Sequence, residues 1–371
     1  MMRLFMQHHY FLYIYTLSAS FLLALGLTCL MRRLALRWGL LDHPGHRKIH
    51  HSPIPLLGGV AIVVTFYVMV IGHMLLFAVM DQYGPAWIER NLSSHFGENS
   101  GLKLTGVLLG GLMIFVLGVV DDMKVLTPWT KLLGQIAAAA VLVLTGNRIE
   151  MFVLSNWWLS AFATIFWVVL IINSMNFLDN MDGLCGGVSI IAAYSFFLCL
   201  QPHEDQLVRF LLMTFAGAVA GFLYFNLSPA RIFMGDAGAM FNGYFLATVA
   251  VLGTFHMETT PTRIAVAAPL LALSVPLFDT ISVVFLRVRS GQNIMLGDKR
   301  HFSHRLVDLG MSPHQAVAFI FLVAAVAGLG GALLPLMDLG GTLIILAQTA
   351  GLFLLIVLLM NAKRRNGGSK S

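Results

Sequence analysis

Eleven long apolar runs follow one another along the chain, and they constrain its fold more than any other feature of the sequence. Runs of roughly 16 to 24 residues cross a hydrocarbon core about 30 Å thick as helices, which satisfy their own backbone hydrogen bonds in lipid. Only 11% of the residues are charged, whereas soluble domains carry roughly a quarter. The sequence therefore predicts an all-α, polytopic integral membrane protein and excludes a water-soluble globule. The spans are expected near 10–31, 55–79, 104–120, 132–147, 157–175, 186–200, 207–225, 239–256, 264–286, 314–336 and 340–361.

Alternation of eleven helices sorts the loops into two sets, which the positive-inside rule separates clearly. One set holds 17 of the 23 Lys and Arg residues, and it comprises the loops near 32–54, 121–131, 173–185, 226–238 and 287–313 and the tail from 362. This set is predicted to be cytoplasmic, with the N-terminus outside and the C-terminus inside. Because these loops come from both ends of the chain, we expect a single domain over 1–371.

The first loop of this set, LDHPGHRKIHHSPIPLLGG, carries a cationic cluster directly before an apolar run. Basic residues beside a membrane ordinarily anchor the chain to lipid headgroups, and this explanation suffices for Arg32, Arg33 and Arg37. Lys48 and His50 lie in a segment punctuated by Pro and Gly, which indicates a fixed loop that approaches a ligand closely. We therefore expect Lys48 and His50 to bind an anionic substrate.

Asp121 and Asp122 stand together where the third run ends, and Lys131 begins the next run. Adjacent carboxylates at a membrane boundary repel one another and lose hydration, so that a positive partner must stabilise them. A divalent cation is one such partner, although an aspartate pair solvated just outside the membrane explains the pattern equally well. The other polar segments decide between these two explanations.

The segment NSMNFLDNMDGLCGG at 173–187 adds amides and carboxylates among apolar residues, with no Lys or Arg nearby. On a helix Asn176, Asp179 and Asn180 would share one face, and Asp182 follows three residues after Asp179. Helix capping would use one or two of these groups. The remainder predict a polar site on the same side of the membrane as the aspartate pair.

The segment NLSPARIFMGDAGAMFNGY places Asp236 between two glycines at the expected start of a helix. Free N–H groups and the helix dipole attract phosphate there, and the carboxylate could hold a metal that bridges to it. An ordinary N-cap is the alternative for so short a motif. Asn226 and Arg231, on the same predicted side, favour the ligand site.

The last basic loop combines Lys299, Arg300, His301, His304 and Arg305, which form a candidate phosphate clamp. The two histidines could alternatively bind zinc, but no cysteine or third histidine is placed to complete such a site.

Asp279 lies about two turns inside the ninth run, where an acid without a role would be costly. Pairing with Arg287 or Arg289 is one expected solution.

Taken together, these segments supply carboxylates for a metal, amides and a basic clamp, all on one predicted side. This is the inventory for transfer at a diphosphate. A secondary transporter would place polar groups near the bilayer midplane and often shows internal repeats, and the sequence has neither feature. A structural scaffold leaves the paired carboxylates unexplained.

These motifs resemble those of the polyprenyl-phosphate N-acetylhexosamine-1-phosphate transferases, a family of the glycosyltransferase 4 type, over nearly the whole chain. DHPGHRKIHHSPIPLLGG, GVVDDMKVLTPWTKLLGQ, NSMNFLDNMDGL, FNLSPARIFMGDAG and HFSHRL occur in the family's order. HFSHRL looks like the branch that uses UDP-GlcNAc or a related UDP-N-acetylhexosamine. The muramoyl-pentapeptide branch, which typically carries adjacent histidines, is the runner-up. The PLFDT motif, which contains Asp279, also recurs in the family.

The resemblance implies transfer of GlcNAc 1-phosphate, or of another N-acetylhexosamine 1-phosphate, from a UDP-sugar to undecaprenyl phosphate. UMP and a lipid-linked sugar diphosphate, which initiates a cell-envelope polysaccharide, are the implied products. The implied location is the bacterial inner membrane, with a cytoplasmic active site. The cofactor is Mg²⁺, with Mn²⁺ as the alternative. No nucleic acid is an expected partner, and homodimer formation is left open.

The resemblance also assigns residues. Asp236 and either Asp121 or Asp122 would bind the metal, and Asp182 and Phe233 match positions that contact uracil, Phe233 by stacking. Asn176, Asn226 and Lys131 would line the phosphate groove, while His301, His304 and Arg305 would hold the donor phosphates and sugar. The expected catalytic set comprises Asp121, Asp122, Asp179, Asp182 and Lys131.

The expected mechanism is direct attack of a lipid phosphate oxygen on the β-phosphorus of the donor. Asp121 or Asp122 could deprotonate the lipid phosphate. The second pKa of a phosphate monoester is about 6, however, so that a general base adds little at neutral pH.

Overall fold

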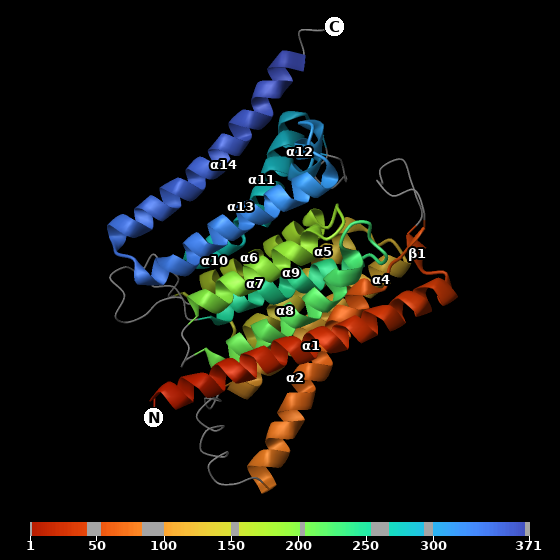
Figure 1. Cartoon of the computed structure of the whole chain (residues 1–371), viewed down its shortest axis with the longest axis vertical. Helices are drawn as coiled ribbons and strands as arrows, with labels where there is room; N and C mark the ends of the chain where they lie inside the picture. Colours follow the sequence, from red (N-terminus) through yellow and green to blue (C-terminus); the bar gives the residue numbers. More distant parts are fainter. Residues whose placement is uncertain are drawn as a thin grey trace.

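The computed structural model describes residues 2–42, 53–83, 100–149, 156–200, 205–253, 267–292 and 300–367. Helices make up nearly all of this part (Figure 1). In chain order the elements are α1 (Met2–Trp38), β1 (Leu41–Asp42), β2 (Ile54–Pro55), α2 (Gly58–Tyr83), α4 (Ser100–Met123), α5 (Pro128–Leu144), α6 (Trp157–Leu178), α7 (Leu184–Cys199), α8 (Gln206–Asn226), α9 (Gly235–Leu252), α10 (Ala268–Ala272), α11 (Ser274–Arg289), α12 (Phe302–Asp308), α13 (Pro313–Leu333), the short 3₁₀ helix η2 (Leu334–Leu336) and α14 (Leu339–Gly367).

These helices confirm the all-α, polytopic membrane architecture that the apolar runs predict. Seven of the described helices are long and apolar enough to cross a membrane, and α5 and α7 are shorter apolar helices. Every expected span overlaps a helix, but the ninth span is divided between two helices. The total of eleven spans and their orientation stay predictions.

The division of the ninth span lies between α10 and α11, at Leu273. Pro276 has no N–H to bond to the carbonyl of Ala272, and its ring crowds that carbonyl. The N–H of Leu277 bonds to the carbonyl of Leu273 at 3.1 Å, so that regular helix resumes directly afterwards. The expectation of one continuous helix over 264–286 is therefore corrected to two helices in the part of this range that is described.

Helix α9 lies inside the bundle, where it packs against α2, α4 and α6 (Figure 1). Helix α8 packs against α1, α2 and α7, and α13 packs against α7 and α10. Gly118 of α4 approaches α9 so closely that an added Cβ would lie 2.4 Å from the Cα of Ala237. Because lipid tails are as apolar as leucine, such close van der Waals packing is what holds helices together in a membrane. The end of α4 and the start of α9 are thereby fixed against each other.

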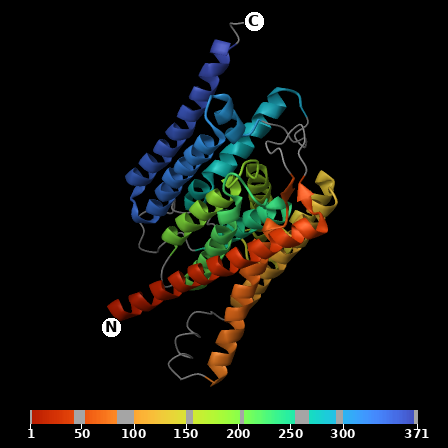
Figure 2. The ribbon, with the colours of Figure 1, turned by 45° about the vertical axis from the view of Figure 1, so that its right-hand side comes forward.

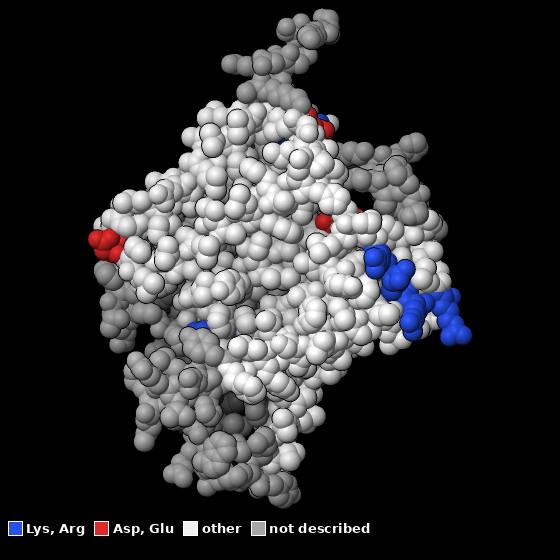
Figure 3. Space-filling model, viewed as in Figure 1, with Lys and Arg blue, Asp and Glu red and all other residues white. Residues whose placement is uncertain are grey.

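The charged side chains gather near the ends of the helices, and most of the face in Figure 3 is uncharged. Basic side chains group where α1 ends, and the last two turns of α1 contain Arg32, Arg33 and Arg37. Helix α14 runs along the outer edge beside α13 (Figure 2), and its apolar stretch Leu339–Asn361 is almost entirely unburied. Such an uncharged outer surface suits contact with lipid.

Two short strands join the described ends of the first loop, a small β element that the all-α prediction did not include. β1 and β2 pair antiparallel, with Asp42 opposite Ile54. A residue that precedes proline favours extended backbone, which suits Ile54. The carbonyl of Pro55 accepts a hydrogen bond from the N–H of Phe233 at 2.7 Å, and the N–H of Gly58 donates to the carbonyl of Phe233 at 3.0 Å. The start of α2 is thus tied to the segment that leads into α9.

Candidate active site

The aspartate pair lies where the end of α4 meets the start of α9. The Asp122 carboxylate accepts hydrogen bonds from the backbone N–H groups of Asp236 at 2.7 Å and Ala237 at 3.1 Å. Gly235 has a φ of +70°, and a Cβ added there would lie 2.6 Å from Asp122 Oδ2. Only glycine meets both conditions without strain. Asp122 therefore caps α9 from a neighbouring helix, at the positive end of the α9 dipole.

Lys131 links the other two carboxylates of the cluster. Thr127 caps α5 by accepting a backbone N–H of its first turn at 3.2 Å, and Pro128 occupies the first helical position. This start directs Lys131 toward α4 and α9, where its Nζ contacts the Asp121 carboxylate and lies 2.7 Å from Asp236 Oδ2. One ammonium group therefore compensates charge on two acids.

Helix α6 brings amide groups to the same place. Asn176 donates a hydrogen bond to Asp236 Oδ1 at 2.7 Å. Asn173, one turn earlier, donates to Gln135 of α5 at 2.7 Å. Gln135 is 1% exposed and is not among the residues predicted from the sequence. The available signal was one amide side chain within an otherwise apolar run.

Asp179 follows directly after α6 and is the C-cap residue of that helix. Burial raises the pKa of Asp179 to about 8, together with the negative charges of Asp236, Asp122 and Asp182. Asp179 is therefore largely protonated at neutral pH. In that state the carboxylic acid can donate a hydrogen bond to a phosphate oxygen.

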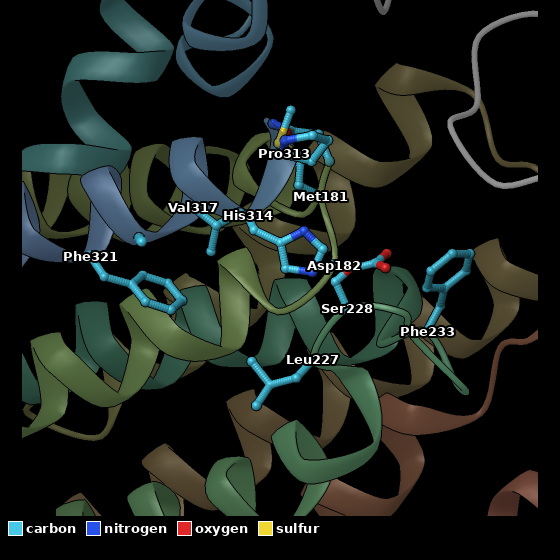
Figure 4. A pocket seen from close by; sticks show the side chains of 11 residues that line it. Met181, Asp182, Leu227, Ser228, Phe233, Pro313, His314, Val317 and Phe321 are labelled. Atoms are coloured by element: carbon cyan, nitrogen blue, oxygen red, sulfur yellow. The ribbon is translucent and has the colours of Figure 1, made fainter. Parts of the chain in front are cut away.

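Asp182 and Phe233 line one pocket of about 240 Å³ (Figure 4). Asp182 Oδ2 accepts the backbone N–H of Ala230 at 3.0 Å, which holds the carboxylate at the pocket wall. His314, which the sequence analysis did not identify, also points into this pocket, while Leu227, Val317 and Phe321 make its other walls apolar. An aromatic face beside a carboxylate acceptor suits a planar polar ring such as a nucleobase.

Asn226 has a supporting position, which corrects the expectation that it lines the phosphate groove. It is 3% exposed. Its side-chain oxygen accepts the N–H of Gly183 at 3.0 Å, and its side-chain nitrogen donates to the carbonyl of Ile232 at 2.9 Å. Both ends of the amide therefore hold together the two segments that carry Asp182 and Phe233.

The described part of the last basic loop lies beside α6 and α11. His301 Nδ1 is 2.8 Å from Asp279 Oδ2, which replaces the expected pairing of Asp279 with Arg287 or Arg289 as the contact that accounts for this acid. The ring centroids of His301 and His304 are 6.5 Å apart, and Arg305 donates to a serine hydroxyl of α11 at 2.5 Å. Burial lowers the pKa of Arg305, while the charge of Asp279 opposes this shift.

Two predicted substrate-binding residues, Lys48 and His50, lie outside the described residues. The described residues on either side of them form the β1 and β2 pair, which contacts the segment before α9.

The cluster offers oxygen ligands of the kind that Mg²⁺ prefers, from Asp121, Asp236 and the amide of Asn176. Within the described ranges, no three His, Cys, Asp or Glu side chains are placed to hold a metal ion by themselves. Mg²⁺ commonly binds through one or two carboxylates and completes its shell with substrate phosphates and water. Both oxygens of Asp122 bond to backbone N–H groups of α9, whereas Asp121 gives one oxygen to the N–H of Leu126 at 2.7 Å and the other to the ammonium group of Lys131. The oxygen of Asp121 that faces Lys131 already binds a cation, which makes Asp121 the better candidate of the pair for a metal ion. The donor set fits Mg²⁺ bound together with a phosphate substrate.

Helices that are apolar enough to cross a membrane thus bring acids, amides and a lysine together, beside a pocket that suits a nucleobase. These features define a membrane-bound transferase. The match to the Glycosyl transferase family 4 covers residues 104–254, from α4 to α9, which contain most of the cluster.

Relatives of known name extend this match over most of the chain. A decaprenyl-phosphate N-acetylglucosaminephosphotransferase of Mycolicibacterium smegmatis is 30% identical over 92% of this chain and 86% of its own length. A probable undecaprenyl-phosphate N-acetylglucosaminyl 1-phosphate transferase of Bacillus subtilis is 29% identical over 82% of this chain and 80% of its own length. The undecaprenyl-phosphate alpha-N-acetylglucosaminyl 1-phosphate transferase of Escherichia coli K12 is 26% identical over 79% and 76%, respectively. The chain belongs to glycosyl transferase family 4.

Proposed function

We propose that this protein transfers GlcNAc 1-phosphate from UDP-GlcNAc to undecaprenyl phosphate and releases UMP. The names of the relatives support a GlcNAc 1-phosphate group and a polyprenyl phosphate acceptor. The observation that carries the proposal is the convergence of Asp121, Lys131, Asn176 and Asp236 from four different helices. With a nucleobase in the pocket of Asp182 and Phe233, the donor diphosphate would lie at this cluster.

Each group then has a chemical task. Phe233 would stack on uracil and Asp182 would accept a hydrogen bond from the ring N–H. Lys131 and Asn176 would bind the diphosphate oxygens. Asp121 and Asp236 would hold Mg²⁺, which when bound neutralises diphosphate charge and favours departure of UMP.

Four further predicted residues would bind the sugar-phosphate end of the donor. His301, His304 and Arg305 supply donors and positive charge for phosphate and hydroxyl groups. Asp179, protonated at neutral pH, would donate to a phosphate oxygen and thereby avoid repulsion of the anionic donor.

The transfer itself would be a single displacement. An oxygen of the lipid phosphate forms a bond to the β-phosphorus, and the bond from that phosphorus to the bridging oxygen breaks, which leaves UMP. The second pKa of a phosphate monoester is about 6, so that the acceptor is largely dianionic at neutral pH and needs no general base. The task of the site is to position and neutralise the two anionic reactants.

The proposal also includes the arrangement in the cell. The apolar runs predict eleven spans, and the distribution of Lys and Arg predicts an outside N-terminus and a cytoplasmic active site. The bacterial inner membrane is the location where a UDP-sugar and a polyprenyl phosphate would meet on that side. Family membership and relatives named as transferases favour this function over the secondary transporter considered from the sequence.

The test is transfer of radiolabelled sugar phosphate by purified protein, with UDP-GlcNAc and undecaprenyl phosphate, in Mg²⁺ and in EDTA. We expect a labelled lipid with Mg²⁺ that disappears in EDTA and in Asp236→Asn. UDP-GalNAc and UDP-MurNAc-pentapeptide serve as competing donors. A labelled lipid from one of these donors alone would change the sugar that the proposal assigns to the enzyme. No labelled lipid with any donor would overturn the proposal.

A further inference from the structure

A single buried carboxylate holds two consecutive residues of the last basic loop. Asp279 of α11 is 0% exposed. Its Oδ2 lies 2.8 Å from His301 Nδ1, and its Oδ1 accepts the backbone N–H of Phe302 at 2.5 Å. Phe302 is the first residue of α12 and is itself 0% exposed. One side chain of α11 therefore fixes both the ring of His301 and the backbone where α12 begins.

This contact determines which nitrogen of His301 meets a ligand. An ionised carboxylate only accepts hydrogen bonds, so that Nδ1 must carry the hydrogen that points to Asp279. Within the described part of the chain, the side chain of His301 makes no other hydrogen bond. Nε2 is therefore the nitrogen left for a ligand.

The direction of the ring is fixed as well. The ring of His301 lies 5.7 Å from that of Phe177, which directly follows the site residue Asn176. Thr280, the next residue after Asp279, donates to Ser174 of α6 at 2.9 Å. Helix α11 thus lies against the part of α6 that leads into the carboxylate cluster, while the ring of His301 itself is held by Asp279 and Phe177.

We propose that Asp279 is a positioning residue, which fixes the tautomer and direction of His301 so that Nε2 faces the bound donor. This inference rests on the proposed function for the identity of the donor. Carboxylates orient histidines in this way at metal sites and at nucleophilic sites. Loss of such a carboxylate lowers metal affinity or catalytic activity through the histidine. Here the partner of the ring would be the phosphate or sugar end of the UDP-sugar.

The variant Asp279→Asn separates this role from simple packing. Asparagine has nearly the same shape but only one acceptor oxygen, whereas two N–H groups must be accepted. If the asparagine oxygen keeps accepting the Phe302 N–H, the asparagine NH2 group faces Nδ1 of His301 and donates to it. The hydrogen of the ring must then lie on Nε2, which is the opposite tautomer. The matched control is Thr280→Val, which removes the neighbouring bond to Ser174 and leaves Asp279 in place.

The experiment measures kcat and KM for UDP-GlcNAc, and thermal unfolding, in the parent, Asp279→Asn, Thr280→Val, His301→Ala and the double variant Asp279→Asn, His301→Ala. We expect kcat/KM to fall roughly 10- to 100-fold in Asp279→Asn and less than about twofold in Thr280→Val. In the His301→Ala background the Asp279→Asn change should cost less than about twofold more, because Asp279 acts through that ring.

A second readout does not depend on turnover. In protein with ¹⁵N-labelled histidine, the signal that disappears in His301→Ala identifies His301. We expect this signal to report hydrogen on Nδ1 in the parent and on Nε2 in Asp279→Asn. The inference would be overturned if the fall in kcat/KM in the double variant equalled the product of the falls in the two single variants. An unchanged His301 signal in Asp279→Asn would overturn it as well. An inactive parent whose His301 signal shifts as expected would instead count against the proposed function.

Discussion

One oxygen of the Asp122 carboxylate accepts a hydrogen bond from the backbone N–H of Asp236 at 2.7 Å, although 114 positions separate the two residues in the chain. The orientation of Asp236 at the start of α9 therefore depends on the end of α4. The adjacent Asp121 has a different environment, because it contacts Lys131. The two neighbouring acids thus have different roles: Asp122 holds the backbone at the start of α9, and Asp121 holds the ammonium group of Lys131.

The first prediction separates these roles by amide substitution. Asp122→Asn leaves one of two N–H groups of α9 without its acceptor, and should lower the free energy of unfolding by about 1 to 2 kcal/mol and also reduce transfer. Asp121→Asn should abolish most transfer with a smaller change in thermal unfolding. Both are measured on purified protein in detergent. Equal unfolding temperatures for Asp122→Asn and the parent would contradict the capping role.

The second prediction concerns Gly235, which has a φ of +70° and borders Asp122. Gly235→Ala should lower stability by at least about 1 to 2 kcal/mol, because a side chain is strained at this φ and its Cβ would meet the carboxylate. Transfer should fall with it, since the start of α9 must move. The control is Gly26→Ala in α1, where an added Cβ meets nothing within 4 Å. Loss of stability in the control but not in Gly235→Ala would show that this constraint is absent.

The third prediction tests the nucleobase pocket through Phe233. Phe233→Leu keeps an apolar side chain but removes the flat ring, so that the Kd for UMP should rise roughly tenfold, as expected for a lost base stack. Phe321→Leu changes the opposite, apolar end of the same pocket and serves as the control. Calorimetric titration with UMP gives both values. An unchanged Kd for UMP in Phe233→Leu would show that the nucleobase does not stack on Phe233.

The fourth prediction follows from Asp179, whose pKa burial and neighbouring acids raise from 3.8 to about 8. A raised pKa in the folded state means that the folded protein binds the proton more tightly than the unfolded chain does. Its contribution to stability is therefore complete below pH about 4 and is lost as pH rises through about 8. Asp179→Asn, which cannot ionise, should unfold at a temperature that depends less on pH between 5 and 8.5. A variant with the same pH dependence as the parent would contradict this shift.

The sequence predicts which residues share the site because loop side follows from the alternation of apolar runs. Asp121, Lys131, Asn176 and Asp236 come from loops assigned to one side, and the structure brings them into contact. The separate roles of Asp121 and Asp122 could not be predicted, because they depend on how α4 is rotated against α9. That rotation is set by close backbone packing, such as Gly118 against Ala237.

Partners across long separations were also beyond prediction. The contact between Asp279 and His301 joins residues 22 positions apart, and α11 ends between them. Charge alone favoured an arginine of the same helix as the partner of Asp279, because residues close in sequence lie close in space whatever path the following loop takes. Gln135 and Asn226 are similar cases, because their amides bond to groups that approach only once the helices pack.

The most direct test of the central claim, transfer of the sugar together with one phosphate, uses UDP-GlcNAc labelled in one phosphate at a time. The donor labelled at the β-phosphorus should give a labelled lipid and unlabelled UMP, and the donor labelled at the α-phosphorus should give labelled UMP and an unlabelled lipid. Labelled UDP from both donors, with sugar but no label on the lipid, would show transfer of the sugar alone and contradict the proposed reaction.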